Sequence, residues 1–369
     1  MRGSLKTTLS GVTSALLLAL LLFGRATPAT AGAARFRLDA REGAERYAFF
    51  LGALERVGHG ASSDTTADDT TAEPAGQSDP WGRVQNESRV RRPGLPSPVS
   101  FRESGGRGLL VETWVNGAGP FTFAIDTGAG ATILSSRTAG AARVEVESRG
   151  GGIEIGGLSG ARAGGARKAF ARTIALGSRE NTLPARGLFV IAPGLPSGVD
   201  GILDPSEAFA SLGFRLDIPA GELSFFDPRA EPLRASDAPR DGAVVPWLTE
   251  AGSRRPFVML AEGRRALLDT GSGFGLAVDE SAARTLGILQ TEGRRGRGAR
   301  DLAGGEVHAR RVRAATVSVG ALVLRGVPTD LLVRAEKGAP VILGRDALRP
   351  FRLSFDPVNR LIMLRPVEE

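Results

Sequence analysis

The sequence contains no cysteine, which excludes disulfides, thiol catalysis and metal sites built on cysteine. Histidine is almost absent, since His59 and His308 are the only two. A Ser-His-Asp triad and a histidine-based zinc site are therefore not expected. The glycine-rich stretch 149–165 also lacks the Gly-Lys-Ser/Thr ending of a phosphate-binding loop. We expect neither a metal nor another cofactor.

Lysine is rare as well: only Lys6, Lys168 and Lys337 occur in a chain whose formal net charge is +7. Arginine carries nearly all of the positive charge, a skew that fits an arginine-favouring coding bias better than a binding surface. The basic runs at 294–297 and 310–313 have no interleaved aromatic residues. We interpret them as solvated faces and expect no nucleic-acid partner.

The N-terminus has the three-part layout of a secretory signal peptide. Arg2 and Lys6 precede the apolar run 15–23, and positions 29–31 read Ala-Thr-Ala, a small-x-small cleavage pattern. The apolar run is shorter than the roughly 20 residues of a membrane span. We expect residues 1–31 to be a signal peptide and the protein to be exported, to the periplasm or outside the cell. An uncleaved anchor, which would keep the chain at the membrane, is the alternative.

Two segments follow before the main folded part. Residues 32–57 are expected to form a short N-terminal helical segment. Residues 58–105 are polar, and the stretch 62–71 has no apolar side chain larger than alanine, so burial cannot offset the entropy of ordering it. We interpret 58–105 as a disordered linker that tethers the domain, or as a propeptide processed near Arg91-Arg92.

Beyond residue 105 a hairpin pattern occurs twice. The apolar run 109–115 is followed by an Asn-Gly turn and a second run, 121–125, that ends at Asp126. Later, the run 256–260 is followed by a Glu-Gly turn and by 265–268, which ends at Asp269. Apolar runs separated by such turns predict β-hairpins.

Further landmarks repeat in register. Asp126 precedes Asp269 by 143 residues, Leu203 precedes Leu343 by 140, and Asp217 precedes Asp356 by 139. Asp217 and Asp356 each begin a proline-containing turn, so we expect both to cap turns. Three landmarks in register indicate a duplication. We therefore predict a duplicated, mostly all-β fold with halves at 106–235 and 236–369.

The repeated tripeptides Asp126-Thr127-Gly128 and Asp269-Thr270-Gly271 carry the candidate chemistry. Two adjacent carboxyls cannot both ionise cheaply, so they share a proton and titrate as a unit, as the paired aspartates of aspartic peptidases are known to do. One carboxyl can then take a proton from water while the other polarises a peptide carbonyl. Each glycine allows the backbone to approach closely, and the threonines can hydrogen-bond between the two turns.

These residues resemble a known family. The segment 123–134, Phe-Ala-Ile-Asp-Thr-Gly-Ala-Gly-Ala-Thr-Ile-Leu, is similar to the catalytic segment of retropepsin-type aspartic peptidases. The segment 341–348, Val-Ile-Leu-Gly-Arg-Asp-Ala-Leu, resembles the family's second signature. Two copies on one chain resemble the pepsin architecture. The resemblance implies a β-rich fold of two lobes, 106–235 and 236–369, with a cleft between them and with Asp126 and Asp269 as catalytic residues. It also implies a polypeptide substrate bound in extended form in that cleft and an acidic pH preference.

The sequence departs from this pattern at several positions. Asp204 stands where a glycine is expected. It could perturb the cleft electrostatically, but we interpret it as a solvent-facing loop acid. Gly275 replaces an expected Thr or Ser. Gly273 replaces the carboxylate that would pair with Arg345, which leaves that arginine without an obvious partner. The glycine pairs 164–165 and 304–305 fall where flap hairpins could lie, or are ordinary loops.

Two functions remain open at this point. The first is an aspartic endopeptidase, monomeric and cofactor-free, with Asp126 and Asp269 as catalytic residues. The second is a peptidase-like module of the cell envelope that binds peptides without cleaving them, an alternative motivated by the departures at Asp204 and Gly275.

Overall fold

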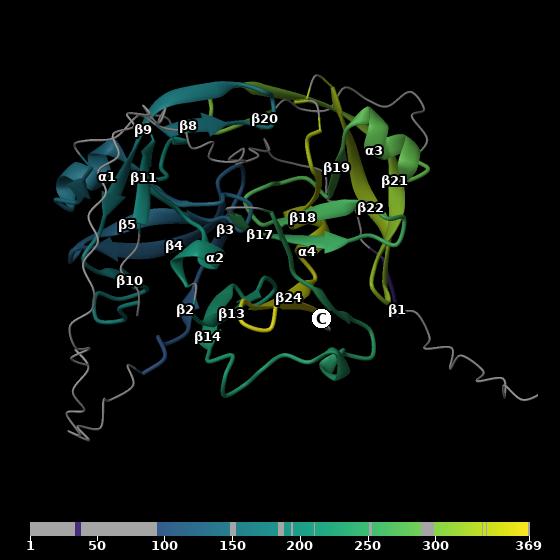
Figure 1. Cartoon of the computed structure of the whole chain (residues 1–369), viewed down its shortest axis with the longest axis horizontal. Coiled ribbons are helices and arrows are strands. Elements are labelled where there is room, and N and C mark those ends of the chain that lie inside the picture. The colour runs from purple at the N-terminus through teal and green to yellow at the C-terminus, as the bar shows by residue number, and fades with distance from the viewer. Residues whose placement is uncertain are drawn as a thin grey trace, which may run out of the picture. The chain divides into compact units, whose positions relative to one another are not determined.

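A computed structural model describes residues 34–37 and 94–367, apart from gaps at 148–152, 184–187, 193–194, 210, 251–252, 289–298, 334 and 337. These residues form a mostly β fold (Figure 1). The expected signal peptide lies outside the described residues, as does the expected linker up to residue 93. Strand β1 (Ala34–Arg37) occupies the start of the segment predicted to be helical, and the remainder of that segment, 38–57, is also outside them.

Ten described strands form the first sheet, in the order β10-β4-β5-β12-β6-β11-β9-β7 with β3 beside β4 and β8 beside β9. Their bounds are β3 (Arg102–Ser104), β4 (Gly108–Val115), β5 (Ala118–Ile125), β6 (Thr132–Ser135), β7 (Glu145–Val146), β8 (Ile153–Gly156), β9 (Arg162–Phe170), β10 (Ile174–Leu176), β11 (Leu188–Ala192) and β12 (Gly201–Leu203). The predicted β4–β5 hairpin is confirmed. Asn116 and Gly117 at its turn have φ of 50° and 77°, the positive values that a tight two-residue turn requires.

Nine described strands form the second sheet, in the order β16-β17-β18-β23-β19-β22-β21-β20 with β1 beside β22. Their further bounds are β16 (Leu248–Glu250), β17 (Ser253–Met259), β18 (Arg265–Asp269), β19 (Leu276–Val278), β20 (Ala299–Arg300), β21 (Glu306–Val319), β22 (Leu322–Val333) and β23 (Val341–Gly344). The predicted β17–β18 hairpin is confirmed, and its turn includes Gly263 at φ 76°.

The two sheets share one strand arrangement. The path β4-β5-β12-β6-β11-β9 has the same sequence of antiparallel and parallel pairings as the path β17-β18-β23-β19-β22-β21. Short helices follow matching strands: α1 (Ser136–Ala141) and α3 (Glu280–Thr285), then α2 (Pro205–Ala208) and α4 (Arg345–Leu348). Strands β5 and β18, which lead to Asp126 and Asp269, therefore occupy matching places.

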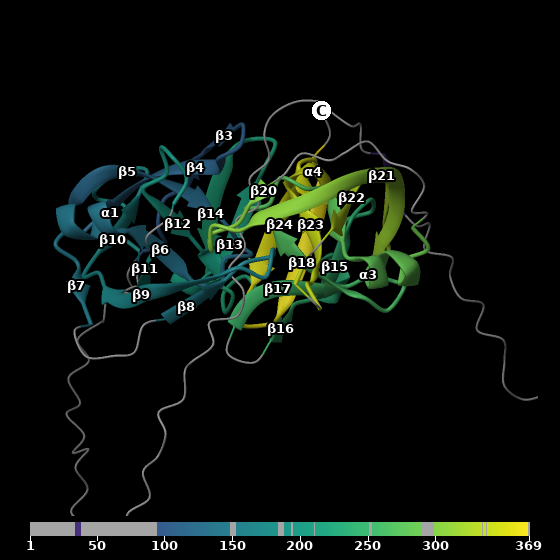
Figure 2. The ribbon, with the colours of Figure 1, turned by 90° about the horizontal axis from the view of Figure 1, so that it is seen from above.

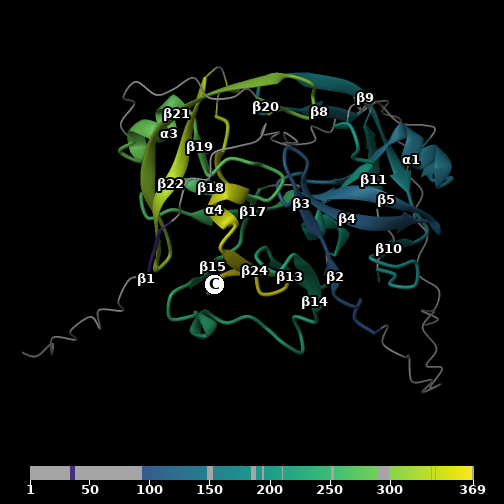
Figure 3. The same ribbon diagram turned by 180° about the vertical axis from the view of Figure 1, so that it is seen from behind.

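A third sheet of six described strands joins the two halves of the sequence, in the order β15-β25-β24-β13-β14-β2 (Figures 1 and 3). Its strands are β2 (Val99–Ser100), β13 (Gly213–Asp217), β14 (Glu222–Phe226), β15 (Ala243–Pro246), β24 (Phe351–Asp356) and β25 (Leu361–Pro366), and the 3-10 turn η1 (Ala235–Asp237) precedes β15. Strand β13 pairs directly with β24, and Phe214 stacks on Phe355 with ring centroids 4.6 Å apart. Aromatic burial at this pairing ties the halves together.

Asp217 and Asp356 cap turns in this sheet, as the sequence predicts. Asp217 Oδ1 accepts from the Ala220 amide at 3.1 Å, and Asp356 Oδ1 accepts from the Val358 and Asn359 amides at 3.0 and 2.8 Å. Both side chains are therefore occupied in local structure.

Strands β2 and β3 lie before the expected start of the first lobe at residue 106. Val99 and Phe101 are buried in the main hydrophobic core, and β3 pairs with β4. The composition of this segment does not predict these two strands, because polar neighbours surround its few apolar residues. Among the described residues, no helix combines the length and apolar character needed to cross a membrane.

Candidate active site

The two Asp-Thr-Gly turns begin at the ends of matching strands. Asp126 follows the last residue of β5, and Asp269 is the last residue of β18. Both carboxyl side chains are fully buried. The apolar strand residues before each aspartate, Ile125 and Leu268, are also fully buried, so each carboxyl is held by a packed, rigid strand.

The turns face each other closely. A Cβ atom placed on Gly128 would lie 2.6 Å from Asp269 Cγ, and one placed on Gly271 would overlap Asp126 Cγ. Each glycine is therefore required by the carboxyl of the opposite turn, because any larger residue would displace it. The structure brings the two predicted aspartates together, with the backbone of each turn against the other's side chain.

The threonines lock the two turns in register. The Thr127 amide donates to Thr270 Oγ1 and the Thr270 amide donates to Thr127 Oγ1, both at 3.1 Å. Thr127 Oγ1 also donates to the Leu268 carbonyl at 2.7 Å, and Thr270 Oγ1 to the Ile125 carbonyl at 3.1 Å. These reciprocal bonds are fully buried, and losing one would leave unpaired polar groups in a dry site.

The environment of the two carboxyls is asymmetric. Burial raises the pKa of Asp126 well above its usual range, and the charges of Asp269 and Asp204 raise it further. Burial also raises the pKa of Asp269, to about 6, but its interaction with Asp126, the Ser272 amide and the Arg345 charge all oppose the rise. The Gly128 amide donates to Asp126 Oδ1 at 2.8 Å, and the Ser272 amide to Asp269 Oδ1 at 2.9 Å. Burial and two acidic neighbours therefore favour the protonated form of Asp126, whereas Arg345 and the Ser272 amide favour ionisation of Asp269.

Arg345 has a partner that the sequence does not reveal. Its Nη1 donates to the Thr270 and Gly271 carbonyls at 2.7 and 2.9 Å, and its Nε lies 3.5 Å from Glu103 Oε1. Glu103 is on β3, far away in the sequence, and also pairs with Arg349 at 2.5 Å. The expectation that Arg345 lacks a partner is wrong, because β3, which lies before the predicted start of the first lobe, supplies the carboxylate that Gly273 does not.

Asp204 is not a solvent-facing loop acid. It is fully buried, and its Oδ1 accepts from the Ser206 amide at 2.9 Å as the N-cap of α2. Burial raises the pKa of Asp204 to about 7. The interpretation fails because parallel pairing of β12 with β5, a non-local contact, carries the end of β12 into the interior.

The departure at Gly275 has a steric reason. A Cβ at Gly275 would overlap the Pro328 carbonyl, so no side chain fits there. At the matching place in the first half, Thr132 Oγ1 accepts from the Asp204 amide at 3.2 Å. In the second half the Gly275 carbonyl itself accepts from the Gly344 amide at 2.9 Å. The backbone thus replaces the missing hydroxyl.

Two hairpin turns meet beside the candidate site, at the top of Figure 1 where β8 and β20 lie close together. Asp301, in the turn between β20 and β21, accepts from the Ser159 amide at 2.9 Å and from Ser159 Oγ at 2.6 Å. Leu158 is buried in a cluster with Phe274, and Leu302 is buried in a cluster with Ala129. Each turn thus inserts a leucine near the residues that follow the other half's Asp-Thr-Gly.

The glycine pairs have different places in these hairpins. Gly304-Gly305 lies in the β20–β21 turn, and the Gly305 amide donates to Asp301 Oδ1 at 2.9 Å. Gly164-Gly165 lies inside strand β9 instead, while residues 157–161 make the turn between β8 and β9. The view from above shows both hairpins reaching towards each other (Figure 2).

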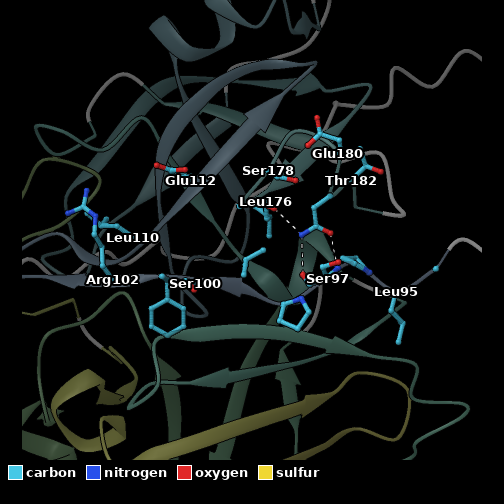
Figure 4. A pocket seen from close by; sticks show the side chains of 17 residues that line it. Leu95, Ser97, Ser100, Arg102, Leu110, Glu112, Leu176, Ser178, Glu180 and Thr182 are labelled. Atoms are coloured by element: carbon cyan, nitrogen blue, oxygen red, sulfur yellow. Dashed lines mark hydrogen bonds between the residues drawn. The ribbon is translucent and has the colours of Figure 1, made fainter.

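A separate pocket of about 810 Å³ lies along residues 94–102 and the turn after β10 (Figure 4). Arg102, Glu112 and Glu180 are among the charged residues that line it. Neither Asp126 nor Asp269 lines this pocket. In the described part of the chain, no group of three His, Asp or Glu side chains is placed to hold a metal ion.

Residues 262–347 match a family model described as aspartyl protease. The match begins just before Asp269 and ends within α4, so it includes both the second Asp-Thr-Gly and Arg345. It supports a relationship to aspartic proteases through this part of the chain. No curated protein matches the sequence.

Proposed function

We propose that the protein is an aspartic endopeptidase whose catalytic residues are Asp126 and Asp269. The observation that carries the proposal is the pair of buried carboxyls, each packed against the glycine of the opposite Asp-Thr-Gly turn. The aspartyl protease match over 262–347 supports the reaction class. Thr127, Gly128, Thr270 and Gly271 support the pair by fixing its geometry.

The asymmetry of the pair assigns the roles. Asp269, ionised beside Arg345, takes a proton from water as the water oxygen bonds to the peptide carbonyl carbon. Asp126 donates its proton to the carbonyl oxygen, which gives a neutral tetrahedral diol. The intermediate collapses as the carbon–nitrogen bond breaks; Asp269 returns its proton to the leaving amine and a diol hydroxyl returns one to Asp126. Water is consumed and both carboxyls regain their starting states.

The proposal extends to the architecture. Two lobes, 106–235 and 236–369, related by duplication and similar to pepsin-like peptidases, account for the shared six-strand path of the two large sheets. A polypeptide substrate would bind in extended form between the lobes, beneath the two meeting hairpins. The protein would act as a monomer after export to the periplasm or beyond. Of the expected linker 58–105, the part up to residue 93 would serve as propeptide or tether, because β2 and β3 belong to the folded unit.

The working pH range follows from the two carboxyls. The reaction needs Asp269 ionised and Asp126 protonated, so activity rises with pH through the Asp269 pKa of about 6 and falls once Asp126 loses its proton. The expected preference is therefore mildly acidic to neutral. This range is less acidic than the family resemblance implies, because burial raises both pKa values.

The test is cleavage of a peptide library between about pH 3 and pH 9, with pepstatin as inhibitor. Asp126→Asn and Asp269→Asn should each reduce kcat at least about 10³-fold, because each removes a proton-transfer group. Asp241→Asn, which removes an exposed carboxyl, is the matched control and should leave kcat unchanged. Full activity in Asp126→Asn would refute the proposal. Peptide affinity without turnover at any pH would favour the binding module instead.

A further inference from the structure

A third carboxyl lies beside the dyad. Strand β12 pairs with β5 in parallel, with Leu203 opposite Ile125, so the next residues, Asp204 and Asp126, follow side by side. The Asp126 amide donates to the Leu203 carbonyl at 2.9 Å, which holds this alignment. Asp204 is fully buried, as Asp126 is.

The Asp204 carboxyl is only half satisfied. Its Oδ1 accepts from the Ser206 amide and from Ser206 Oγ, at 2.9 and 2.5 Å. Its Oδ2 is buried and accepts no hydrogen bond of normal length and angle from the described residues. The Gly130 amide still interacts with the carboxyl and lowers its pKa. A cap for the four-residue helix α2 needs only the first oxygen, so the cap role explains half of the group. The second oxygen remains to be explained, because a buried carboxyl oxygen without a full hydrogen bond is costly.

The matching position in the other half has no carboxyl. Strand β23 pairs with β18 as β12 pairs with β5, and there Gly344 is opposite Asp269. The charged neighbour on that side is a cation, Arg345, which donates to the carbonyls of the turn after Asp269. Asp126 thus has an acidic neighbour, Asp204, at the position where Asp269 has Gly344 followed by Arg345.

We propose that Asp204 is a positioning residue for the reaction: it holds the shared proton on Asp126 and extends activity to higher pH. The inference rests on the proposed peptidase function. An anion beside Asp126 disfavours loss of its proton, whereas the Arg345 cation favours ionisation of Asp269. Together they fix which carboxyl is the acid and which is the base.

The other charged groups around Asp204 do not cancel this effect. Glu207, on α2, adds a second negative charge on the same side. Arg254, on β17, contacts Glu207 through its amide, which donates to Oε1 at 3.2 Å, and its charge acts on Glu207. From the sheet side, Thr132 on β6 is neutral and contacts only the Asp204 backbone. The field at Asp126 from this side is therefore negative once Asp204 ionises.

The experiment compares pH profiles of kcat/KM for the wild type and Asp204→Asn. Asparagine keeps the helix cap but removes the charge. The high-pH limb should move down by about one pH unit, so kcat/KM above that limb falls about tenfold, while the low-pH limb stays in place. Asp241→Asn, which removes an exposed carboxyl, is the matched control and should leave both limbs in place. A uniform loss at every pH in Asp204→Asn, or an unmoved limb, would overturn the inference.

A second measurement does not depend on catalysis. Unfolding free energies of the wild type, Asp126→Asn, Asp204→Asn and the double variant form a double-mutant cycle, measured at about pH 5 and about pH 9. The two substitutions should be additive at the lower pH, where Asp204 is neutral, and clearly non-additive at the higher pH. Additivity at both values would refute the coupling even in an active enzyme. An inactive wild type with a pH-dependent coupling would refute the peptidase proposal and leave the carboxyl coupling standing.

Discussion

At the scale of single residues, the candidate site depends on one buried arginine. Arg345 is 4% exposed, and its guanidinium links the turn of Asp269 to Glu103 on β3. Arginine suits this place because its planar fork can donate to two carbonyls and a carboxylate at once, whereas lysine offers a single point charge. The same charge lowers the pKa of Asp269 against the effect of burial.

Arg345→Gln should therefore change both stability and pH dependence. Two buried carbonyls lose their donor, which costs about 2–4 kcal/mol of unfolding free energy. Without the cation, the pKa of Asp269 rises, so the low-pH limb of kcat/KM should move up by about one unit. Denaturant unfolding and a pH profile measure the two effects. Arg349→Gln, which also removes a partner of Glu103 but no contact to the turn, is the control. If both variants move the limb equally, Arg345 has no special role.

The sequence predicts the dyad at this scale because its signals are local. Asp126 and Asp269 each end an apolar run, and strand and turn patterns follow from neighbouring residues. Glu103 and Asp204 could not be placed in the same way. Glu103 lies in a polar run before the predicted first lobe, and the burial of Asp204 depends on which strand lies beside β12. Strand pairing across long separations is not encoded in any short window of sequence.

At the scale of elements, the two meeting hairpins close over the residues that follow each Asp-Thr-Gly. Asp301 is 5% exposed and takes three hydrogen bonds, two from Ser159 and one from the Gly305 amide. Leu158 of the first half is buried in a cluster of second-half residues, and Leu302 of the second half is buried in a cluster of first-half residues. The dyad carboxyls are fully buried, so a substrate needs an opening to reach them, and we predict that this hairpin contact is the part that opens.

Ser159→Ala should loosen the contact without unfolding the protein. It removes one hydrogen bond to a buried carboxylate, worth about 1.5–3 kcal/mol. Amide hydrogen exchange in peptides covering 153–170 and 299–309 should become at least about tenfold faster, while peptides of β13 and β24 keep their protection. Ser178→Ala, at an exposed serine in the turn after β10, is the control and should leave all peptides unchanged. Unaltered exchange at both hairpins would show that they do not open through this contact.

The hairpins also show that a glycine pair alone does not predict the position of a turn. The glycine pair 304–305 falls in a turn as its composition suggests, but the pair 164–165 falls inside β9. Glycine permits a turn without requiring one, so its presence fixes the turn only where neighbouring residues also favour it. In the β20–β21 turn, Asp301 supplies that second preference by accepting from the Gly305 amide.

At the scale of the whole molecule, the folded unit begins earlier in the sequence than the predicted first lobe. Strands β2 and β3 precede residue 106; β2 pairs with β14 in the six-stranded sheet and β3 pairs with β4 in the ten-stranded sheet. Glu103 on β3 reaches the second half through Arg345 and Arg349. The segment 99–104 therefore links three parts of the structure: two sheets and the turn of Asp269. The segment also has a counterpart in the second half: β2 flanks β14 as β15 flanks β25, and β3 pairs with β4 as β16 pairs with β17. The landmarks matched in the sequence all lie after it, so they do not reveal this part of the repeat.

Two shortened chains test the role of this segment. A chain beginning at Gly94 keeps β2 and β3, and should fold and retain peptidase activity. A chain beginning at Gly106 loses the buried side chains of Val99 and Phe101, which contribute about 3–6 kcal/mol by burial, and also loses Glu103. It should unfold at a clearly lower temperature in a thermal scan and show kcat/KM reduced at least about tenfold.

Glu103→Gln in the Gly94 chain separates the loss of the carboxylate from the loss of buried apolar side chains. It should reproduce part of the activity loss with little of the stability loss, because Glu103 is partly exposed whereas the two apolar residues are buried. Equal melting temperatures for the two shortened chains would show instead that the part from residue 106 onwards folds without β2 and β3.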